Sequence, residues 1–415
     1  MFSLYPHQVQ GLQWLQKQEN SYIKGGILAD DMGVGKTIQI ITLILRSSMK
    51  KTLIVVPANI LSQWKQEIEK FAPSINVIVH WGLSRINTSK LEKLESISKS
   101  IVLTSYGLIN NSIFSEIEFD RVVCDEAHIF RNIRTKVFKH LDKLKINTRW
   151  ALTGTPIQNS IKDIITIFKY VGCKMVNKTN VDTYIKTKLL RRMKEDINIV
   201  LPTINKKTIF IEERSKIDEI IYQKIEDGNF DGECELERLL RLRQSSISTN
   251  MVLESLEKKF GIELSKFKTS NYKLKYIFRD ILKNKESNKF IVFTHFNYEI
   301  KALSEMLSKS NIRFDKISGN VSITQRNKII DSDDIDVLLI QINAGGTGIN
   351  LQKYNYVYFT APHWNPTIEF QALCRVYRIG QTSNVTIKRI ICKQTIESRI
   401  VDIQTKKNEI ADKHI

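Results

Sequence analysis

The sequence predicts an α/β fold built from two parallel sheets, with helical additions between them. Short runs rich in Val and Ile alternate with longer stretches of helical periodicity, first in the N-terminal part of the chain and again toward the C-terminus. Apolar strands that alternate with helices are typical of parallel sheets covered on both faces. A chain of 415 residues also exceeds what one hydrophobic core usually serves, which favours two or three domains.

Strand and helix patterns divide the chain into three parts. Buried strands are predicted over residues 52–57, 75–80, 100–105 and 119–126, with an amphipathic helix over 58–72. A second set of strands is predicted over residues 289–296, 312–319, 336–341, 354–360 and 385–392. From about Asn159 to Asn288 strand signals are sparse and a charged helical pattern dominates, as in 235–244. We therefore expect an N-terminal lobe over 1–170, helical insertions and a linker over 171–270, and a C-terminal lobe over 271–415.

The composition favours a polyanionic partner. The formal charge is +19, from 63 Lys plus Arg against 44 Asp plus Glu, and nucleic acid is favoured over a merely solvated basic surface. The five cysteines form no CxxC or Cys/His cluster, so neither a zinc site nor a disulfide framework is indicated. No long apolar run and no secretion signal is present, so we expect a soluble, intracellular protein without membrane contact.

A phosphate-loop signature lies between a short apolar run and a segment of helical length. Its glycines would let backbone amides point at phosphate oxygens, at the positive end of the following helix. Lys36 would reach the β- and γ-phosphates, and Thr37 would hold magnesium. Asp30 stands where the first glycine of GxxxxGK[ST] is usual. The candidate nucleotide-binding residues of the loop are Asp31, Met32, Gly33, Val34, Gly35, Lys36 and Thr37.

A DEAH sequence, residues 125–128, directly follows the predicted strand RVVC. Its carboxylates should lie at the carboxyl edge of a parallel sheet, where ligands bind in such folds. Asp125 is placed to bind magnesium, and Glu126 to orient or deprotonate an attacking water. A surface acidic turn is the alternative, and the phosphate loop upstream weighs against it.

Several segments match, in order, the motifs of one enzyme group: LYPHQVQGLQWL, GGILADDMGVGKT, LTGTPIQN, LLRRMKEDINIVLP, INAGGTGINLQ and HWNPTIEFQALCRVYRIGQ. With them the chain resembles the Swi/Snf-type ATPases of helicase superfamily two, a group that includes chromatin remodellers and DNA-repair translocases. The resemblance runs over nearly the whole chain. It implies two RecA-like lobes, with ATP and Mg²⁺ as cofactors.

The resemblance also implies roles for residues outside the phosphate loop. Gln8 would contact adenine, although His7 stands where a Tyr is usual. Residues of the LTGTPIQN segment, namely Thr153, Gly154 and Thr155, would couple the nucleotide state to DNA contact. Glycines of the second lobe, namely Gly345, Gly346 and Gly348, would allow close backbone approach to the other lobe or to DNA.

Gln371, Arg375 and Arg378 are spaced i, i+4 and i+7, which predicts that one helical face carries all three. Arginines donated to a transferring phosphoryl group can be worth about 10³–10⁵ in rate. We therefore expect ATP to be hydrolysed at a site shared by the two lobes. An exposed arginine pair is the alternative.

The resulting hypothesis is a bare, monomeric motor that translocates on double-stranded DNA and remodels protein–DNA complexes through non-specific backbone contacts. We expect a motor without accessory domains, because the motifs extend over nearly all of the sequence up to Gln381. A nucleosome, a polymerase, a repair intermediate or viral proteins all suit such a motor, in the nucleus or in a viral replication compartment. Two alternatives stay open: an RNA-dependent superfamily-two helicase, and a catalytically weak DNA-binding scaffold. The basic residues Lys186, Lys188, Arg191, Arg192 and Lys194 would contact phosphate or form a solvated helix face.

Overall fold

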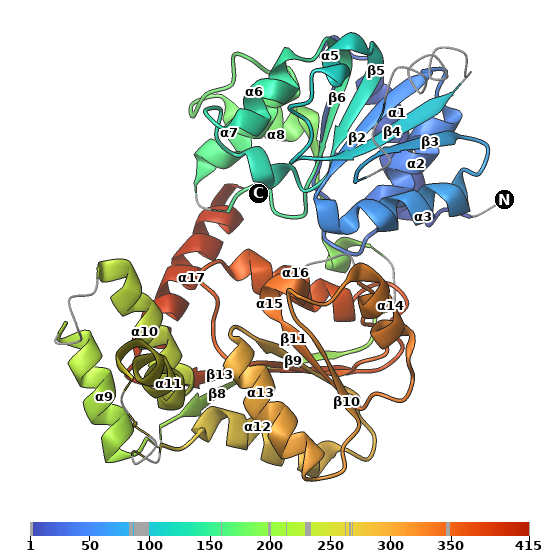
Figure 1. Cartoon of the computed structure of the whole chain (residues 1–415). Helices are drawn as coiled ribbons and strands as arrows, with labels where there is room; N and C mark the ends of the chain where they lie inside the picture. Colours follow the sequence, from blue (N-terminus) through green and yellow to red (C-terminus); the bar gives the residue numbers. More distant parts are fainter. Residues whose placement is uncertain are drawn as a thin grey trace. The chain divides into compact units, whose positions relative to one another are not determined.

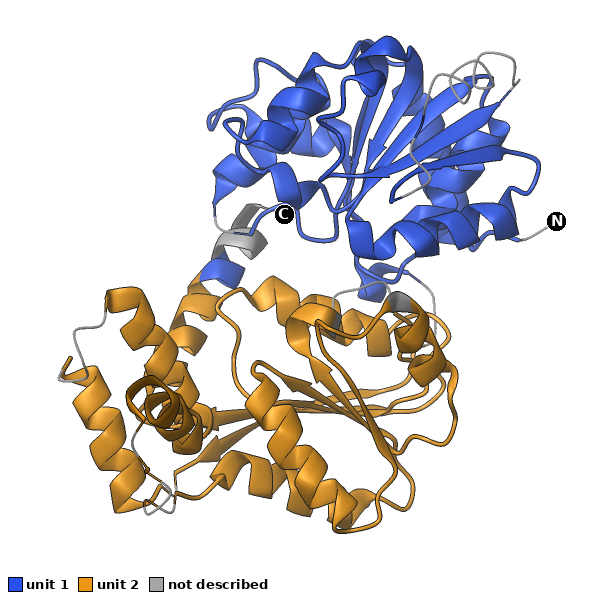
Figure 2. Ribbon diagram, in the orientation of Figure 1, with its two compact units in different colours: residues 1–199, 407–415 blue, residues 200–406 orange. Residues whose placement is uncertain are grey.

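The computed structural model describes residues 3–82, 86, 99–158, 160–197, 201–212, 214–228, 234–261, 263–264, 267, 269–345 and 349–414. The chain forms two compact units, one of residues 1–199 with 407–415 and one of residues 200–406 (Figures 1 and 2). This division differs from the three parts expected from the sequence. Residues 171–190 complete the first unit and residues 201–270 belong to the second, because each stretch adds a strand to the sheet of its unit.

The first unit is built on a seven-stranded sheet with the order β3-β4-β2-β5-β6-β1-β7. Every strand pairing described in it is parallel. The strands are β1 Gly25–Leu28, β2 Lys51–Val56, β3 Asn76–His80, β4 Ser100–Ser105, β5 Phe119–Cys124, β6 Ile146–Leu152 and β7 Leu189–Leu190.

Helices cover both faces of this sheet, because its strands are apolar on both sides. In β2, Leu53 and Val55 pack into one core cluster while Ile54 and Val56 pack into the other. One face is covered by α1 Pro6–Glu19, α2 Lys36–Arg46 and α3 Leu61–Phe71. The other carries α5 Ile113–Glu116, α6 Lys136–Lys143, α7 Ile161–Tyr170 and α8 Val181–Lys188. Short 3₁₀ turns are η1 Ala58–Ile60, η2 Ala127–Phe130 and η3 Lys194–Asp196.

The second unit has a six-stranded sheet with the order β10-β11-β9-β12-β13-β8, again with parallel pairing throughout the described strands. The strands are β8 Ile204–Ile211, β9 Phe290–Thr294, β10 Phe314–Ile317, β11 Val337–Gln341, β12 Tyr356–Phe359 and β13 Val385–Cys392. Its helices are α9 Lys216–Glu226, α10 Glu235–Ile247, α11 Thr249–Phe260, α12 Tyr272–Asn284, α13 Asn297–Ser308, α14 Ile323–Asp331, α15 Ile342–Gly345, α16 Pro366–Val376 and α17 Ile396–His414.

The helical additions pack within the second unit. Buried side chains of α9, α10 and α11 form one cluster with Ile396 and Ile400 of α17. Lys273 of α12 and Glu397 of α17 form a buried ion pair at 2.5 Å. Because both charges are buried, each needs the other in place, and this pair anchors the start of α17 to the second unit.

The fold class predicted from the sequence, α/β with two parallel sheets, is confirmed. All the strands predicted from Val- and Ile-rich runs are present, with ends shifted by at most a few residues. Three strands escaped prediction, namely β6, β7 and β8. In β8, residues 205–208 are exposed, because it is an edge strand and its pattern is not that of a buried one.

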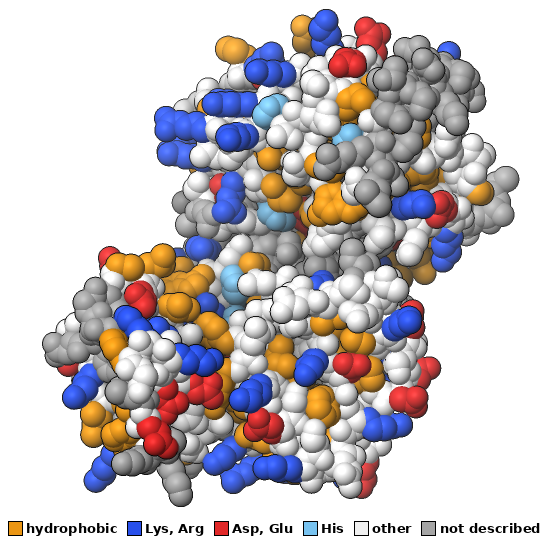
Figure 3. All heavy atoms as spheres, viewed as in Figure 1, with side chains coloured by type: hydrophobic (Ala, Val, Ile, Leu, Met, Phe, Trp, Pro, Cys, Tyr) orange, Lys and Arg blue, Asp and Glu red, His pale blue; other side chains and the backbone are white. Residues whose placement is uncertain are grey.

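Within the described residues, no helix is both long and apolar enough to span a bilayer. On the face drawn in Figure 3, side chains of both charge signs are spread over both units.

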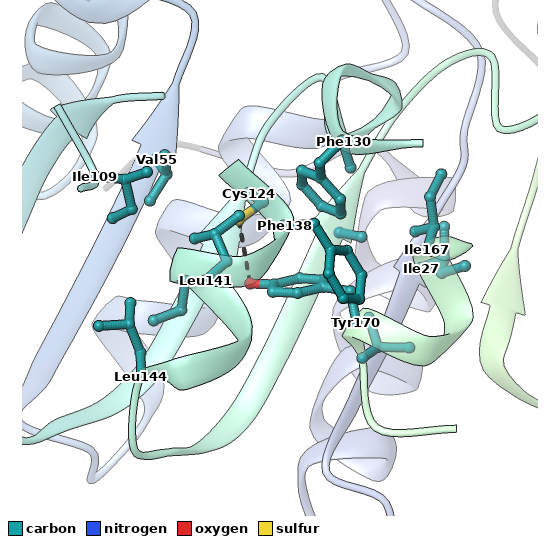
Figure 4. Packing of buried hydrophobic residues seen from close by; sticks show 14 of the residues in the cluster. Ile27, Val55, Ile109, Cys124, Phe130, Phe138, Leu141, Leu144, Ile167 and Tyr170 are labelled. Carbon is teal, nitrogen blue, oxygen red and sulfur yellow. Dashed lines mark hydrogen bonds between the residues drawn. The ribbon is translucent and has the colours of Figure 1, made fainter. Parts of the chain in front are cut away.

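The core behind β5 is aromatic and closely packed (Figure 4). Phe130 and Tyr170 meet edge to face with ring centroids 4.9 Å apart, and the Tyr170 hydroxyl lies 3.1 Å from Cys124 Sγ. Burial raises the pKa of Cys124 to about 12, so the side chain stays a neutral thiol. Cys124 thus packs the strand end that carries Asp125.

A buried ion pair ties α1 to the amino end of β5. Arg121 donates from Nε and Nη2 to the two Glu19 carboxylate oxygens, at 2.6 and 2.7 Å. Trp150 Nε1 donates to the same carboxylate at 3.0 Å. The Arg121 side chain is fully buried and that of Glu19 is 8% exposed, so water cannot solvate either charge if its partner is removed.

We predict that Arg121→Met lowers the free energy of unfolding by about 3–5 kcal/mol, because it leaves the Glu19 carboxylate buried without its partner. Urea unfolding followed by circular dichroism measures the change. The control is Lys65→Met, which breaks a half-exposed pair with Glu69 at 3.5 Å and should cost less than about 1 kcal/mol. Equal losses in the two variants would contradict the assignment of a buried structural pair.

Candidate active site

The phosphate loop connects β1 to α2 at the carboxyl edge of the first sheet. Gly33 and Gly35 have φ values of 84° and 97°, a left-handed backbone that glycine adopts freely. Gly35 is the N-cap of α2, and a Cβ there would lie 2.4 Å from Gln8 Nε2. The loop therefore presents backbone amides at the positive end of an 11-residue helix, which is an arrangement suited to phosphate.

Lys36, the first residue of α2, folds back over the loop. Its Nζ donates to the carbonyl oxygens of Asp30 at 2.7 Å and Asp31 at 3.2 Å. These neutral acceptors hold the ammonium at the loop, where phosphate oxygens of a nucleotide can replace them.

Asp125 follows β5 and is nearly fully buried. Its Oδ2 accepts from Trp64 Nε1 at 2.7 Å, and its backbone carbonyl accepts from the Tyr106 hydroxyl at 2.6 Å. Burial, and next the Glu126 charge, raise the pKa of Asp125 to about 6, against the opposing effects of Trp64 and of the Lys36 ammonium. Asp125 follows β5 and the phosphate loop follows β1, two strands separated only by β6 in the same parallel sheet, so the loop and the carboxylate lie at one edge of the sheet.

Glu126 has a left-handed backbone, with φ at 52°. Such a conformation in a non-glycine residue costs about 1–3 kcal/mol and concentrates at functional sites. Its amide donates to Asp125 Oδ1 at 2.9 Å, and its Oε2 lies 3.3 Å from His128 Nδ1. The side chain keeps 19% of its surface exposed while Oε2 itself is buried, so one carboxylate oxygen is positioned against His128.

The predicted coupling segment follows β6 and contacts the loop. The buried Thr153 hydroxyl accepts from the Thr155 amide at 3.1 Å. Gly154 packs against Met32, since a Cβ there would lie 2.6 Å from Met32 Cγ. Farther along, Gln158 accepts from Arg131 Nη1 at 2.5 Å and donates to the Thr155 hydroxyl at 3.3 Å. The segment thus links the phosphate loop with the chain that follows Glu126.

The N-terminal segment is anchored on the same loop. Gln8 Nε2 donates to the Val34 carbonyl at 3.2 Å, and His7 Nε2 lies 3.0 Å from the same oxygen. The Tyr5 ring stacks on His7 with centroids 5.9 Å apart and remains 47% exposed. Sequence reasoning missed Tyr5, which supplies an exposed aromatic beside the position where His7 replaces one.

The end of β7 and the residues that follow it form backbone hydrogen bonds with the phosphate loop. The amides of Ala29 and Asp31 donate to the carbonyls of Leu190 and Arg192, at 2.7 and 2.9 Å. Lys194 Nζ lies 3.9 Å from Asp31 Oδ2.

The sequence predicted that the basic residues of this stretch either contact phosphate or form a solvated helix face. Lys188 and Arg192 do neither, because their side chains bond to other parts of the protein. Lys188 is buried, and its Nζ donates to Gln18 and Ser21. Arg192 donates to Asp30. The sequence did contain a signal for this pairing, which is the opposite charge of the segments DD at 30–31 and RRMK at 191–194.

In the second unit, Gln371 and Arg375 lie on α16, which Asn365 caps by accepting from the Thr367 amide at 3.1 Å. The expectation that Arg378 shares their helical face is wrong, because α16 ends at Val376. Gln381 Nε2 donates to the Val376 carbonyl at 3.1 Å, and the Leu351 amide donates to the Arg375 carbonyl at 3.0 Å. These carbonyls are bonded outside the helix, so the helix ends there. Arg375 Nε is buried and has no hydrogen-bond partner among the described residues.

Of the predicted glycines, Gly345 ends α15, while Gly346 and Gly348 lie outside the described residues.

The donor set suits a magnesium ion carried with a nucleotide. No group of three or more His, Cys, Asp or Glu that could hold a metal exists within the described part of the chain. Mg²⁺ needs no such cage, because it keeps several waters and is held by one or two protein oxygens together with substrate phosphates. The Asp125 carboxylate and the Thr37 hydroxyl at the start of α2 fit that requirement.

Comparison with known proteins identifies related sequences along the whole chain. The family model of the SNF2-related domain matches residues 7–310, and that of the helicase conserved C-terminal domain matches residues 272–380. An uncharacterized ATP-dependent helicase of Mycoplasma genitalium is 30% identical over 99% of this chain and 42% of its own length. Its Mycoplasma pneumoniae counterpart is 31% identical with the same coverage, and the CHD3-type chromatin-remodeling factor PICKLE of Arabidopsis thaliana is 26% identical over 97% and 34%.

The chain spans less than half the length of these relatives. Among solved structures, the Sulfolobus solfataricus SWI2/SNF2 ATPase core in complex with dsDNA is 27% identical, with coverage of 99% of this chain and 92% of that one and a TM-score of 0.46. The family resemblance expected from the sequence is confirmed by the SNF2-related model, which covers well over half of the 415 residues. The chain belongs to the SNF2-related family of helicase-type ATPases.

Proposed function

We propose that this chain is an ATP-dependent translocase on double-stranded DNA that remodels protein–DNA complexes. The observation that carries the proposal is the combination, at one edge of the parallel sheet, of the phosphate loop with Lys36 and the buried Asp125. ATP hydrolysis needs a phosphate cradle, a cation at the γ-phosphate and a metal-holding carboxylate.

The phosphates bind to the amides of the loop and to the α2 N-terminus, and Lys36 exchanges the Asp30 and Asp31 carbonyls for β- and γ-phosphate oxygens. Gln8 reads the adenine, with Tyr5 beside it as a stacking surface. Thr37 and Asp125 would hold Mg²⁺, and the bound ion would supply positive charge against the charge that develops on the phosphates.

Glu126 orients the attacking water and accepts its proton. Its left-handed backbone and its contact with His128 fix the direction of the carboxylate, while part of the side chain stays exposed. Because Gly154 rests on Met32 of the loop, a change of nucleotide state at the loop reaches residues 153–158 directly.

Arg375 and Arg378 supply cations for the charge that develops during phosphoryl transfer. The support for this role is the buried Arg375 Nε, which lacks a hydrogen-bond partner among the described residues. A guanidinium with an unused donor is suited to an incoming anion.

Duplex DNA is the proposed partner because basic side chains gather near the coupling segment. An exposed basic run follows η2 and continues along α6: Arg131, Arg134, Lys136, Lys139, Lys143 and Lys145. Figure 3 shows blue side chains gathered over the part of the first unit where α6 and α7 lie. Contacts of this kind neutralise backbone phosphates and carry no sequence information, so binding should be non-specific and dependent on salt.

The first prediction from this function is that duplex DNA stimulates ATP hydrolysis more than single-stranded DNA or RNA does. Glu126→Gln should retain ATP binding and lose turnover by about 10²–10⁴-fold, because it removes the proton acceptor. Steady-state ATPase assays with each nucleic acid, and with Lys36→Ala as the phosphate-contact variant, measure this. Stimulation by RNA alone would move the chain to an RNA-dependent enzyme, and turnover at the wild-type rate in Glu126→Gln would refute the role of that residue.

The second prediction concerns pH. Magnesium binding needs ionised Asp125, so kcat/KM for ATP with Mg²⁺, which reports the free enzyme, should fall as the pH drops through about 6. Trp64→Phe removes a hydrogen bond that favours the carboxylate, so the pKa of Asp125 rises and the acidic limb of the pH–rate profile moves to higher pH. Trp150→Phe removes a matching indole bond to Glu19 and should leave the limb unmoved. An unmoved limb in Trp64→Phe would show that another group controls the profile.

The third prediction is that Arg375→Ala lowers turnover by about 10³-fold or more while DNA affinity at low salt stays unchanged. Single-turnover hydrolysis and a fluorescence-anisotropy titration with duplex DNA separate the two effects. Arg313→Ala, which alters an exposed arginine of the second unit paired with Asp336 at 2.8 Å, is the control and should change neither quantity. Turnover that survives in both Arg375→Ala and Arg378→Ala would rule out the proposed cations.

A further inference from the structure

We propose that Arg192 is a positioning residue that holds the phosphate loop in its nucleotide-binding conformation before the nucleotide arrives. This inference rests on the proposed function, because it assumes that residues 30–37 bind the phosphates. Arg192 lies in the first unit, just beyond β7, and its backbone carbonyl already accepts from the Asp31 amide at 2.9 Å.

The side chain of Arg192 forms an ion pair with the first residue of the loop, Asp30. Its Nε donates to Asp30 Oδ1 at 2.9 Å, and Nη2 donates to the second Asp30 oxygen, so the contact is a two-pronged pair. Gln39 completes the set by donating to Asp30 Oδ2 at 3.1 Å and accepting from Arg192 Nη2 at 2.9 Å. The Asp30 side chain is fully buried, and both of its oxygens are bonded.

The same guanidinium reaches the N-terminal segment, because Arg192 Nη1 donates to the His7 carbonyl. One side chain therefore joins α1, the phosphate loop and α2. Its Nε, Nη1 and Nη2 atoms each donate to a protein acceptor, on three segments in all, so Arg192 acts on nucleotide through the loop.

Gly11 of α1 shows that the helix is built around this cluster. A Cβ at Gly11 would lie 1.8 Å from Gln39 Oε1 and 2.7 Å from Arg192 Nη2. Glycine inside a helix costs about 1 kcal/mol relative to alanine, and here it leaves the space that Gln39 and Arg192 occupy.

The cluster explains Asp30, which stands where phosphate loops commonly have glycine. In this chain the first residue of the loop is held by a buried charge pair instead of turning on the freedom of a glycine. A loop that is already ordered loses little conformational entropy when nucleotide binds. The ion pair should therefore increase the affinity for nucleotide.

The expected kinetic signature follows from that reasoning. A loop held equally in the ground state and the transition state contributes uniform binding, so its loosening raises KM and leaves kcat little changed. Arg192→Lys keeps the charge but loses the fork that matches the carboxylate. We expect KM for ATP and Kd for mant-ADP with Mg²⁺ to rise about tenfold, with kcat within about twofold of wild type.

Arg121→Lys is the matched control. Arg121 is a buried arginine of the same unit that makes the same two-pronged contact, with Glu19, near the amino end of β5 and therefore toward the opposite edge of the sheet from the loop. It should lower the melting temperature without raising KM or Kd.

A second variant guards against poor folding of Arg192→Lys. Gln39→Met keeps the volume and the ion pair but removes the amide that bonds both partners, and should raise the mant-ADP Kd about threefold.

Unchanged Kd in Arg192→Lys and Gln39→Met, or a fall in kcat at constant KM, would overturn the positioning role. The mant-ADP titration needs no turnover, so it tests Arg192 even if wild type hydrolyses no ATP, which would refute the proposed function alone. Wild type that binds no mant-ADP would overturn both.

Discussion

The site depends on one constraint, which is that parallel strands end at the same edge of their sheet. In the first unit β5, β6, β1 and β7 are adjacent, and all their described pairings are parallel. The segments that follow them are Asp125 and Glu126, the coupling segment, the phosphate loop and Arg192. Residues that are far apart along the chain are thereby brought together without any long loop. Apolar side chains on both sheet faces keep these four strands in register.

Buried charge is used in two different ways at this edge. Both oxygens of the Asp30 carboxylate accept hydrogen bonds from Arg192 and Gln39, so this charge serves to hold the loop. Among the described residues, the buried Asp125 carboxylate accepts only from Trp64 Nε1 and the Glu126 amide, and burial raises its pKa to about 6. A carboxylate left with unused acceptor capacity near a lysine is suited to a magnesium ion, whereas a saturated one is suited to structure. The two aspartates thus divide positioning and chemistry between them.

Much of the fold could be predicted because buried parallel strands have a plain signature. β2, β4, β9 and β13 appear as Val- and Ile-rich runs, and α3 appears as an amphipathic pattern. β6 escaped because Asn147 and Arg149 interrupt its amino half, and β8 because an edge strand exposes Lys206 and Lys207. The end of α16 was also misplaced. The spacing of Arg375 and Arg378 suits a helix, but Gln381 bonds the Val376 carbonyl and the helix stops there.

The sequence by itself determined the chemical parts: the loop glycines, Lys36, the Asp125–Glu126 pair, the order of the motifs and the family to which they belong. These are local patterns, because the residues that form each motif lie within a few positions of one another in the sequence. Only the tertiary structure decided which charges are paired. Arg192 meets Asp30 across 162 positions, and Arg121 meets Glu19 across 102, because strand order and register bring them together. Local sequence shows that a lysine or arginine is present, but its partner depends on the sheet that the whole unit forms.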